Sequence, residues 1–292
     1  MSLVISQIIN GLQAGSIYAL VALGYSMVYS IIRLLNFAHG EVIMVGAYVA
    51  WMTMVTFALS PILAIILAVA SCVALGVLIE KAAYTPLRKS PRISLLITAI
   101  GISFLLQNLA LLIFGAGAQR VPPIISGPAI HIANQRIGFV ALVTIIVSIA
   151  SMAVLTFLVQ KTKMGKAMRA VSEDLGAAQL MGININRTIS FTFAVGSALA
   201  GIGSILFVSA YPQASPTMGA MLGIKAFVAA VLGGIGSIPG AMIGGFAIGL
   251  AEALVSSIGL SVWRDGVVFA ILILVLLIKP TGLMGKPINV KV

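Results

Sequence analysis

The chain has 292 residues, of which 61% are hydrophobic and only 8% are charged. Because soluble domains carry about 25% charged residues, this composition excludes a water-soluble globular protein and indicates a membrane protein. The net charge of +11 lies in short basic blocks between apolar runs, which is typical of residues that set membrane orientation and unlike a nucleic-acid-binding domain.

The first apolar stretch runs from about Ile5 to Leu59, with one polar interruption between Arg33 and Glu41. As a single helix it would be about 75 Å long, whereas the hydrocarbon core of a bilayer is about 30 Å thick. We therefore predict that this stretch crosses the membrane twice, or crosses once and re-enters, with its break at the polar group. Residues 1–13 lack the positive charge and the cleavage site of a signal peptide, so we expect the first apolar run to be retained.

The polar break contains three candidates for the translocation path, Asn36, His39 and Glu41. A charge at mid-bilayer costs about 2.5–3.5 kcal/mol on insertion scales, so Glu41 is expected to face protein, water or Arg33. In one interpretation the three residues line or gate a path at a discontinuous helix. In the other they lie at the inner membrane boundary, mark a turn between two spans, and leave Arg33 to snorkel.

Three further apolar runs occupy residues 62–79, 93–114 and 137–159. They are continuous and of roughly the 20 residues that a transmembrane helix needs, and the lack of alternation argues against a barrel. A basic segment, 81–92, follows the first run, and a Gly- and Pro-containing segment follows the second. Gln107 and Asn108 lie in mid-span, where they either hydrogen-bond to neighbouring helices or contact a substrate.

The most polar stretch of the chain is residues 160–187. Its apolar side chains recur at intervals of three and four residues, which predicts one apolar face of a short helix. They are Met164, Ala167, Met168 and Val171. The other faces carry basic residues, namely Lys163, Lys166 and Arg169. A second short helix is expected to follow, with Ser172 as its N-cap, Glu173 and Asp174 in its first turn and Gly182 as its C′ residue.

This pair of short helices is longer than a connection between two spans requires. One interpretation is a docking surface, because a short amphipathic helix fits a groove on a cytoplasmic partner. The alternative is a helix lying flat on the lipid surface, with its lysines fixing the topology. The pattern alone favours neither interpretation.

The last third begins with an apolar run at 188–210 and a Pro-containing loop at 211–216. A Gly-rich double segment follows at 222–257, and a final span at 267–278.

Glycines four residues apart predict close helix packing. They are Gly236, Gly240 and Gly244 in one set and Gly245 and Gly249 in another. Pro239 and the Gly233–Gly234 pair predict a re-entrant break, which would alternatively expose backbone near Ser237 to the path. Glu252 lies within an apolar helix. If it faces the bundle it is a candidate for the path or for a subunit interface, and if it lies near the outer face it is simply hydrated.

The basic residues predict the orientation of the chain. Segments 81–92, 160–187 and 279–292 contain 4, 5 and 3 of the 17 Lys and Arg residues, whereas 115–137 contains 2. By the positive-inside rule the first three segments are cytoplasmic and the fourth is periplasmic. Each cytoplasmic segment is then separated from the next by an even number of membrane crossings, provided that residues 222–258 cross twice. We therefore predict an all-α, polytopic bundle of about eight or nine membrane segments, some broken. It would form one domain over residues 1–292, with the N-terminus outside and the C-terminus in the cytoplasm.

Four segments, in order along nearly the whole chain, resemble the permeases of high-affinity branched-chain amino-acid importers of the ATP-binding-cassette class. They are residues 33–41 (RLLNFAHGE), the loop 165–183, residues 231–241 (VLGGIGSIPGA) and residues 279–285 (KPTGLMG). Within the loop, Ala177, Ala178 and Gly182 match an Ala-Ala-x-x-x-Gly core that such permeases carry in their cytoplasmic loop. The Glu that opens this motif in many of them is Gly176 here, so its salt bridge is not transferred, and Glu173 or Asp174 is the nearest replacement.

The resemblance implies a permease subunit of the inner membrane that works with a second, homologous permease, two cytoplasmic ATPases and a periplasmic binding protein. It also implies that Lys166, Arg169, Glu173 and Asp174 lie at the ATPase-coupling surface, together with the Ala-Ala-x-x-x-Gly core. The chain has no G-x-x-x-x-G-K-[ST] sequence, so ATP is expected to be hydrolysed by a partner.

No catalytic constellation and no Cys or His spacing of a metal site occurs, so we expect neither enzymatic activity nor a bound cofactor or metal. A path with few charges suits an aliphatic zwitterion, but it also suits urea, short amides or aliphatic polyols. An ion-coupled amino-acid carrier is the main alternative, because Glu41, Glu80 and Glu252 are candidate intramembrane carboxylates. A channel-like facilitator is a third, although no filter motif is present.

Overall fold

The computed structural model describes residues 2–33, 36–88, 90–132 and 135–285. Four parts of the segments predicted above lie outside these ranges, namely residues 34–35 of the first motif, Lys89, residues 133–134 of the segment 115–137, and residues 286–292 of the basic tail. The first half contains α1 (Ser2–Ile32), α2 (His39–Trp51) with a π-helical extension (Met52–Thr56), α3 (Pro61–Ile79) with a π-helical extension (Glu80–Tyr84), α4 (Thr85–Leu87), α5 (Arg92–Phe114), β1 (Gln119–Arg120), β2 (Ile130–Ile132) and β3 (Gln135–Ile137).

The second half contains α6 (Phe139–Lys161), α7 (Lys163–Glu173), α8 (Leu175–Leu180), α9 (Ile185–Ala210), β4 (Gln213–Ala214), α10 (Met218–Gly233), α11 (Ile238–Ser257), a 3₁₀ turn (Ser261–Trp263) and α12 (Arg264–Ile278). Within the described ranges, seven helices are long and apolar enough to cross a membrane, and α10 is a shorter apolar helix. With the short α2, the helices agree with the predicted polytopic bundle of about eight or nine segments.

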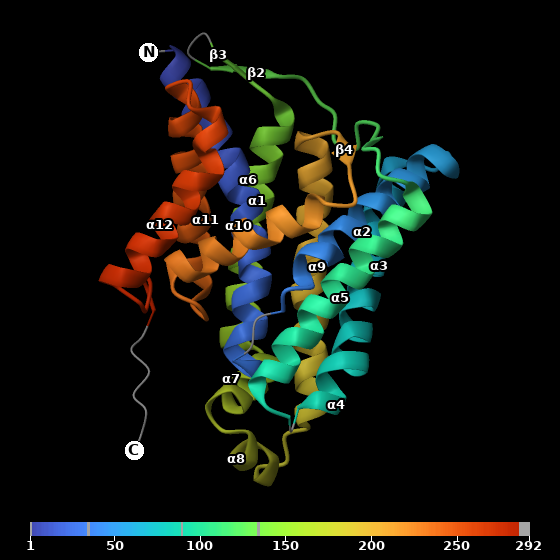
Figure 1. Ribbon diagram of the computed structural model, residues 1–292, viewed down its shortest axis with the longest axis vertical. Helices are drawn as coiled ribbons and strands as arrows, with labels where there is room; N and C mark the ends of the chain where they lie inside the picture. The colour runs from blue at the N-terminus through green and yellow to red at the C-terminus, as the bar shows by residue number, and fades with distance from the viewer. Residues whose placement is uncertain (1, 34–35, 89, 133–134, 286–292) are drawn as a thin grey trace.

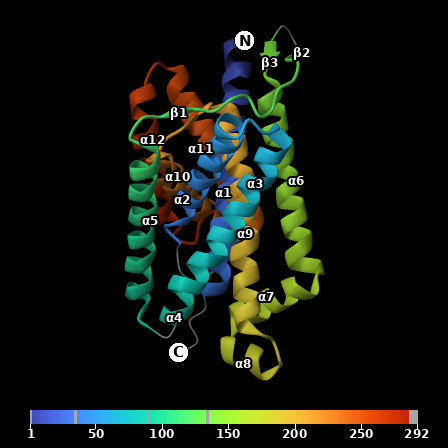
Figure 2. The same ribbon diagram turned by 90° about the vertical axis from the view of Figure 1, so that its right-hand side faces the viewer.

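The long helices run between two ends of the molecule (Figure 1). The N-terminus and the β2–β3 hairpin lie at one end, and α4, α7 and α8 lie at the other (Figures 1 and 2). At the N-terminal end, β1 pairs antiparallel with β4, with Gln119 opposite Ala214, and so joins two loops. The segments 81–92 and 160–187 therefore lie at the same end, and 115–137 lies at the opposite end. This is the distribution over the two sides that the basic residues predicted.

Helix α1 forms the centre of the bundle and is largely buried along its length. It packs against α11, where glycines let the backbones meet. A Cβ added to Gly245 would lie 2.4 Å from the Ala19 Cα, and one added to Gly249 would lie 2.3 Å from the Gly15 nitrogen. Helices α5, α6 and α12 lie at the periphery and expose apolar side chains. The α1–α11 contact is therefore a seam of small residues within a core that also buries large apolar side chains such as Ile17, Leu23 and Phe193.

Two helices begin inside the bundle. After α1 ends, the chain turns at Arg33, which has a φ of 54°, and α2 starts near the middle of the long axis (Figure 1). Helix α10 crosses the same middle region, and then Gly234 and Gly236, with φ of 103° and 90°, turn the chain into α11. The first apolar stretch therefore runs the length of the bundle as α1 and returns through a second, broken segment that contains α2. This is the predicted arrangement of two passes with a break at the polar group.

Candidate translocation path and coupling segment

The start of α2 meets the start of α10 in the middle of the bundle. A Cβ added to Gly40 would lie 2.2 Å from the Gly219 carbonyl oxygen, and one added to Gly219 would lie 2.6 Å from Glu41 Oε2. The contact therefore excludes a side chain at either glycine. Because the N-termini of both helices carry partial positive charge, this point favours a carboxylate, supplied here by Glu41.

The three candidates in the polar break are all buried in the bundle. The Tyr84 hydroxyl donates to Asn36 Oδ1 at 3.2 Å, and Ser103 Oγ of α5 donates to Glu41 Oε1 at 3.2 Å. His39 packs edge-on against Tyr25, with ring centroids 4.8 Å apart. Their burial places the break inside the bundle rather than at its surface, and their part in translocation stays a prediction.

Two buried polar atoms of this break have no hydrogen-bond partner among the described residues. Within the described part of the chain, neither His39 Nε2 nor Glu41 Oε2 has a hydrogen-bond partner, although both are buried. A buried polar atom without a partner costs about 1–3 kcal/mol, so such atoms point to strain or to a site that another state satisfies.

Glu252 lies in a second polar cluster, nearer the N-terminal end. Its Oε2 accepts from the Tyr18 hydroxyl at 2.9 Å, and its Oε1 lies 2.8 Å from Lys225 Nζ. Lys225 Nζ also lies 2.7 Å from Asp265 Oδ1 of α12. One lysine therefore bridges two carboxylates and ties α10 to α11 and α12.

The sequence interpretation named Glu252 but missed Lys225 and Asp265. A signal was available, because Lys225 is the only basic residue and Glu252 the only acidic residue between positions 188 and 263. A lone cation and a lone anion in neighbouring apolar segments are expected to pair.

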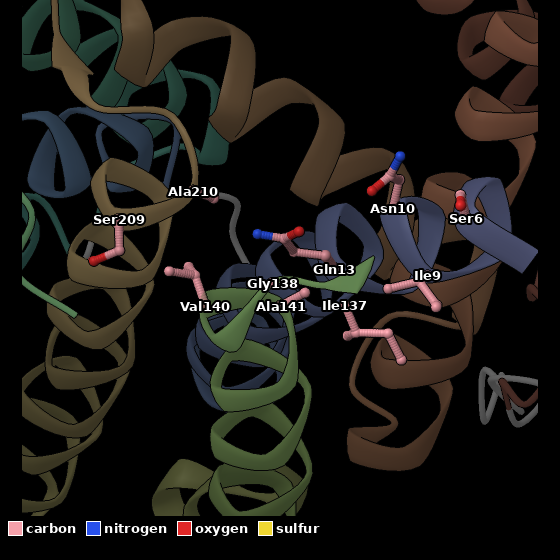
Figure 3. A pocket seen from close by; sticks show the side chains of 10 residues that line it. All are labelled: Ser6, Ile9, Asn10, Gln13, Ile137, Gly138, Val140, Ala141, Ser209 and Ala210. Atoms are coloured by element: carbon pink, nitrogen blue, oxygen red, sulfur yellow. The ribbon is translucent and has the colours of Figure 1, made fainter. Parts of the chain in front are cut away.

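Two cavities open near the N-terminal half of α1. One, of about 280 Å³, is lined by α1, α6 and α9, and Asn10 and Gln13 of α1 are among its lining residues (Figure 3). The other, of about 400 Å³, shares Asn10, Gln13 and Ala210 and extends to Glu252 and Arg264. The amides of α1 therefore lie between the bundle centre and the loops of the N-terminal end.

The remaining path candidates lie elsewhere. Asn108 is exposed on α5 and its Nδ2 donates to the Phe104 carbonyl at 2.8 Å, while Gln107 is half-buried. Ser237 is the N-cap of α11, where its Oγ accepts from the Gly240 amide at 3.2 Å. Gln107 lies one helical turn from Ser103, the residue of α5 that donates to Glu41, whereas Ser237 lies at the turn between α10 and α11. A path role for Gln107, Asn108 and Ser237 stays a prediction.

The packing glycines divide over two helix contacts. Gly240 and Gly244 face α10, where added Cβ atoms would lie 2.3 Å from the Gly233 oxygen and 2.0 Å from the Ala229 oxygen. Gly245 and Gly249 face α1, as described above. Gly236 does not belong with them, because it precedes α11 and lies in the turn with a positive φ. Its spacing of four from Gly240 is therefore not a helical repeat.

Two motifs that lie far apart in the sequence meet at this turn. The Leu283 amide donates to the Leu232 carbonyl at 2.9 Å, and the Met284 amide donates to the Gly233 carbonyl at 2.9 Å. The described part of the tail thus satisfies carbonyls at the end of α10, which otherwise have no helical partner.

The polar stretch 160–187 forms two short helices, as predicted, and α7 is anchored to the bundle. Met168 and Val171 of its apolar face are buried, whereas Lys166 and Arg169 are exposed. Arg169 Nη1 donates to the Val159 carbonyl at the end of α6. Because its apolar face packs inward, α7 has no free apolar face for a partner's groove or for lipid.

The second helix, α8, is open to solvent. Leu180 and Met181 are 90% and 82% exposed, although both are apolar. Ala177 is also exposed, whereas Ala178 is buried against the bundle. An apolar tip exposed in this way is unusual unless another protein covers it.

The cap of α8 differs from the prediction. Ser172 lies within α7, where its Oγ donates to the Arg169 carbonyl, and the N-cap is Asp174, whose Oδ1 accepts from the Ala177 amide at 2.9 Å. The correction has a simple reason, since α7 runs through Glu173 and both Ser and Asp are good caps. Gly182 has a φ of 80°, as expected of a C′ residue.

Polar contacts connect this segment to the first half of the chain. Arg33 Nη2, just after α1, donates to the Ser172 carbonyl at 3.2 Å. Arg88, after α4, donates to Asn186 Oδ1 at 2.6 Å and pairs with buried Glu80 at 3.3 Å. A displacement of α7 and α8 would therefore act on α1, α3 and α9 together.

No group of three or more His, Cys, Asp or Glu side chains in the described ranges is placed to hold a metal ion. Glu80 and Glu252 are each paired with a cation, so of the three carboxylates considered for an ion-coupled carrier Glu41 is the one without an ion pair in the described structure.

Comparison with known proteins gives a consistent result. Residues 7–276 match the family model described as branched-chain amino acid transport system / permease component. The high-affinity branched-chain amino acid transport system permease protein LivH of Escherichia coli is 43% identical, with 97% of this chain and 96% of the relative covered. The corresponding permease BraD of Pseudomonas aeruginosa is 41% identical over the same shares.

A solved structure has the same overall fold at low sequence identity. PsaBC from Streptococcus pneumoniae, in complex with a Fab, aligns with a TM-score of 0.50 and 12% identity. The alignment covers 93% of this chain and 91% of that one.

Proposed function

Because this chain belongs to the family of branched-chain amino acid transport permeases, we propose that it is the membrane-spanning subunit of an ATP-binding-cassette importer for branched-chain amino acids. It resides in the inner membrane and crosses it several times. The chemistry of ATP hydrolysis belongs to separate subunits, because the sequence has no phosphate-binding loop.

The proposed orientation places the α8 end in the cytoplasm. Residues 81–92 and 160–187 bring basic side chains to that end, which is the cytoplasmic signature. The N-terminus and the β2–β3 hairpin then lie on the periplasmic side, where a binding protein delivers the substrate. The basic tail is proposed to be cytoplasmic, and α12, which precedes it, runs back toward the α8 end (Figure 1).

The proposed complex contains this chain, a second homologous permease, two cytoplasmic ATPases and the binding protein. One observation carries the proposal, namely the exposed apolar tip of α8 on a segment that is otherwise anchored in the bundle. A partner ATPase covers Leu180 and Met181. Closure of the ATPases on ATP moves α8, and α7 follows because the two helices meet directly at Asp174. The buried apolar face of α7 then passes the movement to the bundle.

This movement reaches the path through the polar contacts at the base of the bundle. Arg33 links α7 to the segment between α1 and α2, and Arg88 links the start of α9 to α3. Both links lead to the polar break, where α2 and α10 begin side by side. A shift there satisfies or exposes the unpartnered atoms of His39 and Glu41 and switches the access of the path.

The test is co-purification with the ATPases encoded beside the permease, using tagged Leu180→Asp. A buried charge at an apolar contact is costly, so we expect loss of the ATPases and of leucine uptake, with membrane insertion unchanged. The matched control is Val262→Asp, because Val262 is 95% exposed near the N-terminal end. Retention of the ATPases by Leu180→Asp, or transport of leucine by the purified chain alone on an ion gradient, contradicts the proposal.

A further inference from the structure

Helix α10 lies across one face of the bundle, between α12 and α5 (Figures 1 and 2). It is too short to span a bilayer, yet one of its faces is not covered by the chain. Met221 and Ile224 on that face are 43% and 39% exposed. Lys225 follows on the same face, one turn from Met221, so a charged group adjoins an exposed apolar surface.

The ion cluster behind this face is asymmetric. The side chains of Lys225 and Glu252 are 14% and 7% exposed, whereas that of Asp265 is 43% exposed. Glu252 is also held by the Tyr18 hydroxyl, and the Tyr18 ring lies 5.7 Å below Lys225 Nζ. Lys225 therefore has one fixed buried partner, Glu252, and one partner, Asp265, that lies exposed at the surface of the chain.

The charge count of the cluster leaves a surplus carboxylate. One ammonium faces two carboxylates at 2.8 and 2.7 Å, so separating Asp265 from Lys225 leaves the lysine neutralised by Glu252. An ion pair with one end exposed is weak, because solvent screens it. A molecule that offers both a carboxylate and an ammonium replaces the broken contact on both sides without a net change of charge.

We propose that the Lys225–Asp265 pair and the exposed face of α10 form a recognition site for an aliphatic α-amino acid zwitterion. The substrate's carboxylate pairs with Lys225, its ammonium pairs with Asp265, and its side chain packs on Met221 and Ile224. Lys225 and Asp265 are specificity-determining residues, since an amide without the carboxylate leaves Lys225 with one partner fewer. This inference rests on the proposed function and assigns the site at which the substrate enters from the periplasmic side.

Helix α10 connects the proposed site to the polar break. Its middle carries the charge and its first turn contacts Gly40 at the start of α2. A substrate bound at Lys225 therefore lies on the same helix that contacts the polar break, and the polar break is in turn linked to α7. Occupancy of the site and movement of the coupling segment act on the same short element.

A cysteine-accessibility experiment tests whether this face is wet. The single native cysteine, Cys72, is buried, so the wild-type chain is a silent background. Met221→Cys in the full complex in proteoliposomes is treated with a water-soluble thiosulfonate reagent from the periplasmic side. We expect modification, slowed when leucine-loaded binding protein is present. Val154→Cys, on the exposed face of α6, is the matched lipid-facing control and is expected to stay unmodified.

A transport measurement tests the ion pair itself. Asp265→Asn is expected to lower the leucine imported per ATP hydrolysed by about tenfold, because a charged contact to the substrate is lost. Arg120→Gln removes an exposed charge on β1, at the same end of the molecule but outside the site, and is expected to keep the wild-type ratio. Binding-protein-stimulated ATP hydrolysis is expected to persist in both variants, which a merely structural defect would not allow.

Two results overturn the inference. One is Met221→Cys as unreactive as Val154→Cys in every nucleotide state, and the other is Asp265→Asn with the wild-type ratio of leucine to ATP. Should Asp265→Asn fail to assemble, the accessibility of Met221→Cys decides alone. A wild-type complex that hydrolyses ATP but imports no leucine fails at the proposed function instead, and the inference falls with it.

Discussion

In the centre of the bundle α1 and α11 approach until glycine backbones touch, whereas the segment 160–187 contacts the bundle through one helix face and leaves α8 open. The first region has no space for an added methyl group at Gly245 or Gly249. The second exposes Leu180 and Met181 almost completely. We propose that the seam keeps the bundle rigid and that the open segment is where a partner ATPase acts on it.

The largest effect is expected in the seam. Gly249→Leu would drive a side chain into Gly11 and Gly15 of α1, so we expect loss of the folded chain from the membrane. Gly101→Leu is the matched control, because nothing lies within 4 Å of a Cβ added there. Detergent-solubilised yield and size-exclusion profiles measure the outcome, and equal behaviour of the two variants would contradict the rigid seam.

The next effect is expected at the connection between the two regions. Arg88→Met leaves buried Glu80 without its cation, which costs about 3 kcal/mol, the lower end for a broken buried pair because Arg88 is a quarter exposed. Thermal unfolding in detergent measures this loss. Arg187→Met, an exposed arginine nearby, is the control and is expected to change stability little. A similar midpoint for both variants would show that the ion pair contributes nothing.

The smallest effect is expected within the open segment. Asp174→Ala removes the cap of α8 and should destabilise that helix by about 1 kcal/mol, with a partial loss of ATPase binding. Ser172→Ala lies inside α7 and is expected to have no such effect, since its backbone carbonyl still accepts from Arg33. Affinity for the partner ATPase, measured in nanodiscs, separates the two. The opposite ranking would support Ser172 as the cap.

The two regions also differ in how much of them was predictable. The long apolar runs predicted the helices, and the basic blocks predicted which connecting segments lie at the same end, because span length and charge are local properties. The apolar face of α7 followed from its spacing, and Gly182 from its place after a helix. Gly236, in contrast, matched a helical spacing by coincidence, since a turn also requires glycine at a positive φ.

Contacts between distant segments were not predictable in the same way. The bridge from Lys225 to Glu252 and Asp265 joins three helices, and the contact of Gly40 with Gly219 joins the starts of α2 and α10, which are far apart in the sequence. Periodicity reports which face of a helix is apolar, but it does not report which helix covers that face. The isolated charges were the one local sign that such a partner exists.

The central claim is that an external ATPase grips the apolar tip of α8 on the cytoplasmic side. Cross-linking from Met181→Cys tests it most directly, because Cys72 is buried and Met181 is 82% exposed. We predict a cross-link to the ATPase in the assembled complex, with Val262→Cys giving none. Modification of Met181→Cys from the periplasmic side, or no cross-link to any nucleotide-hydrolysing subunit in an active complex, would contradict the account.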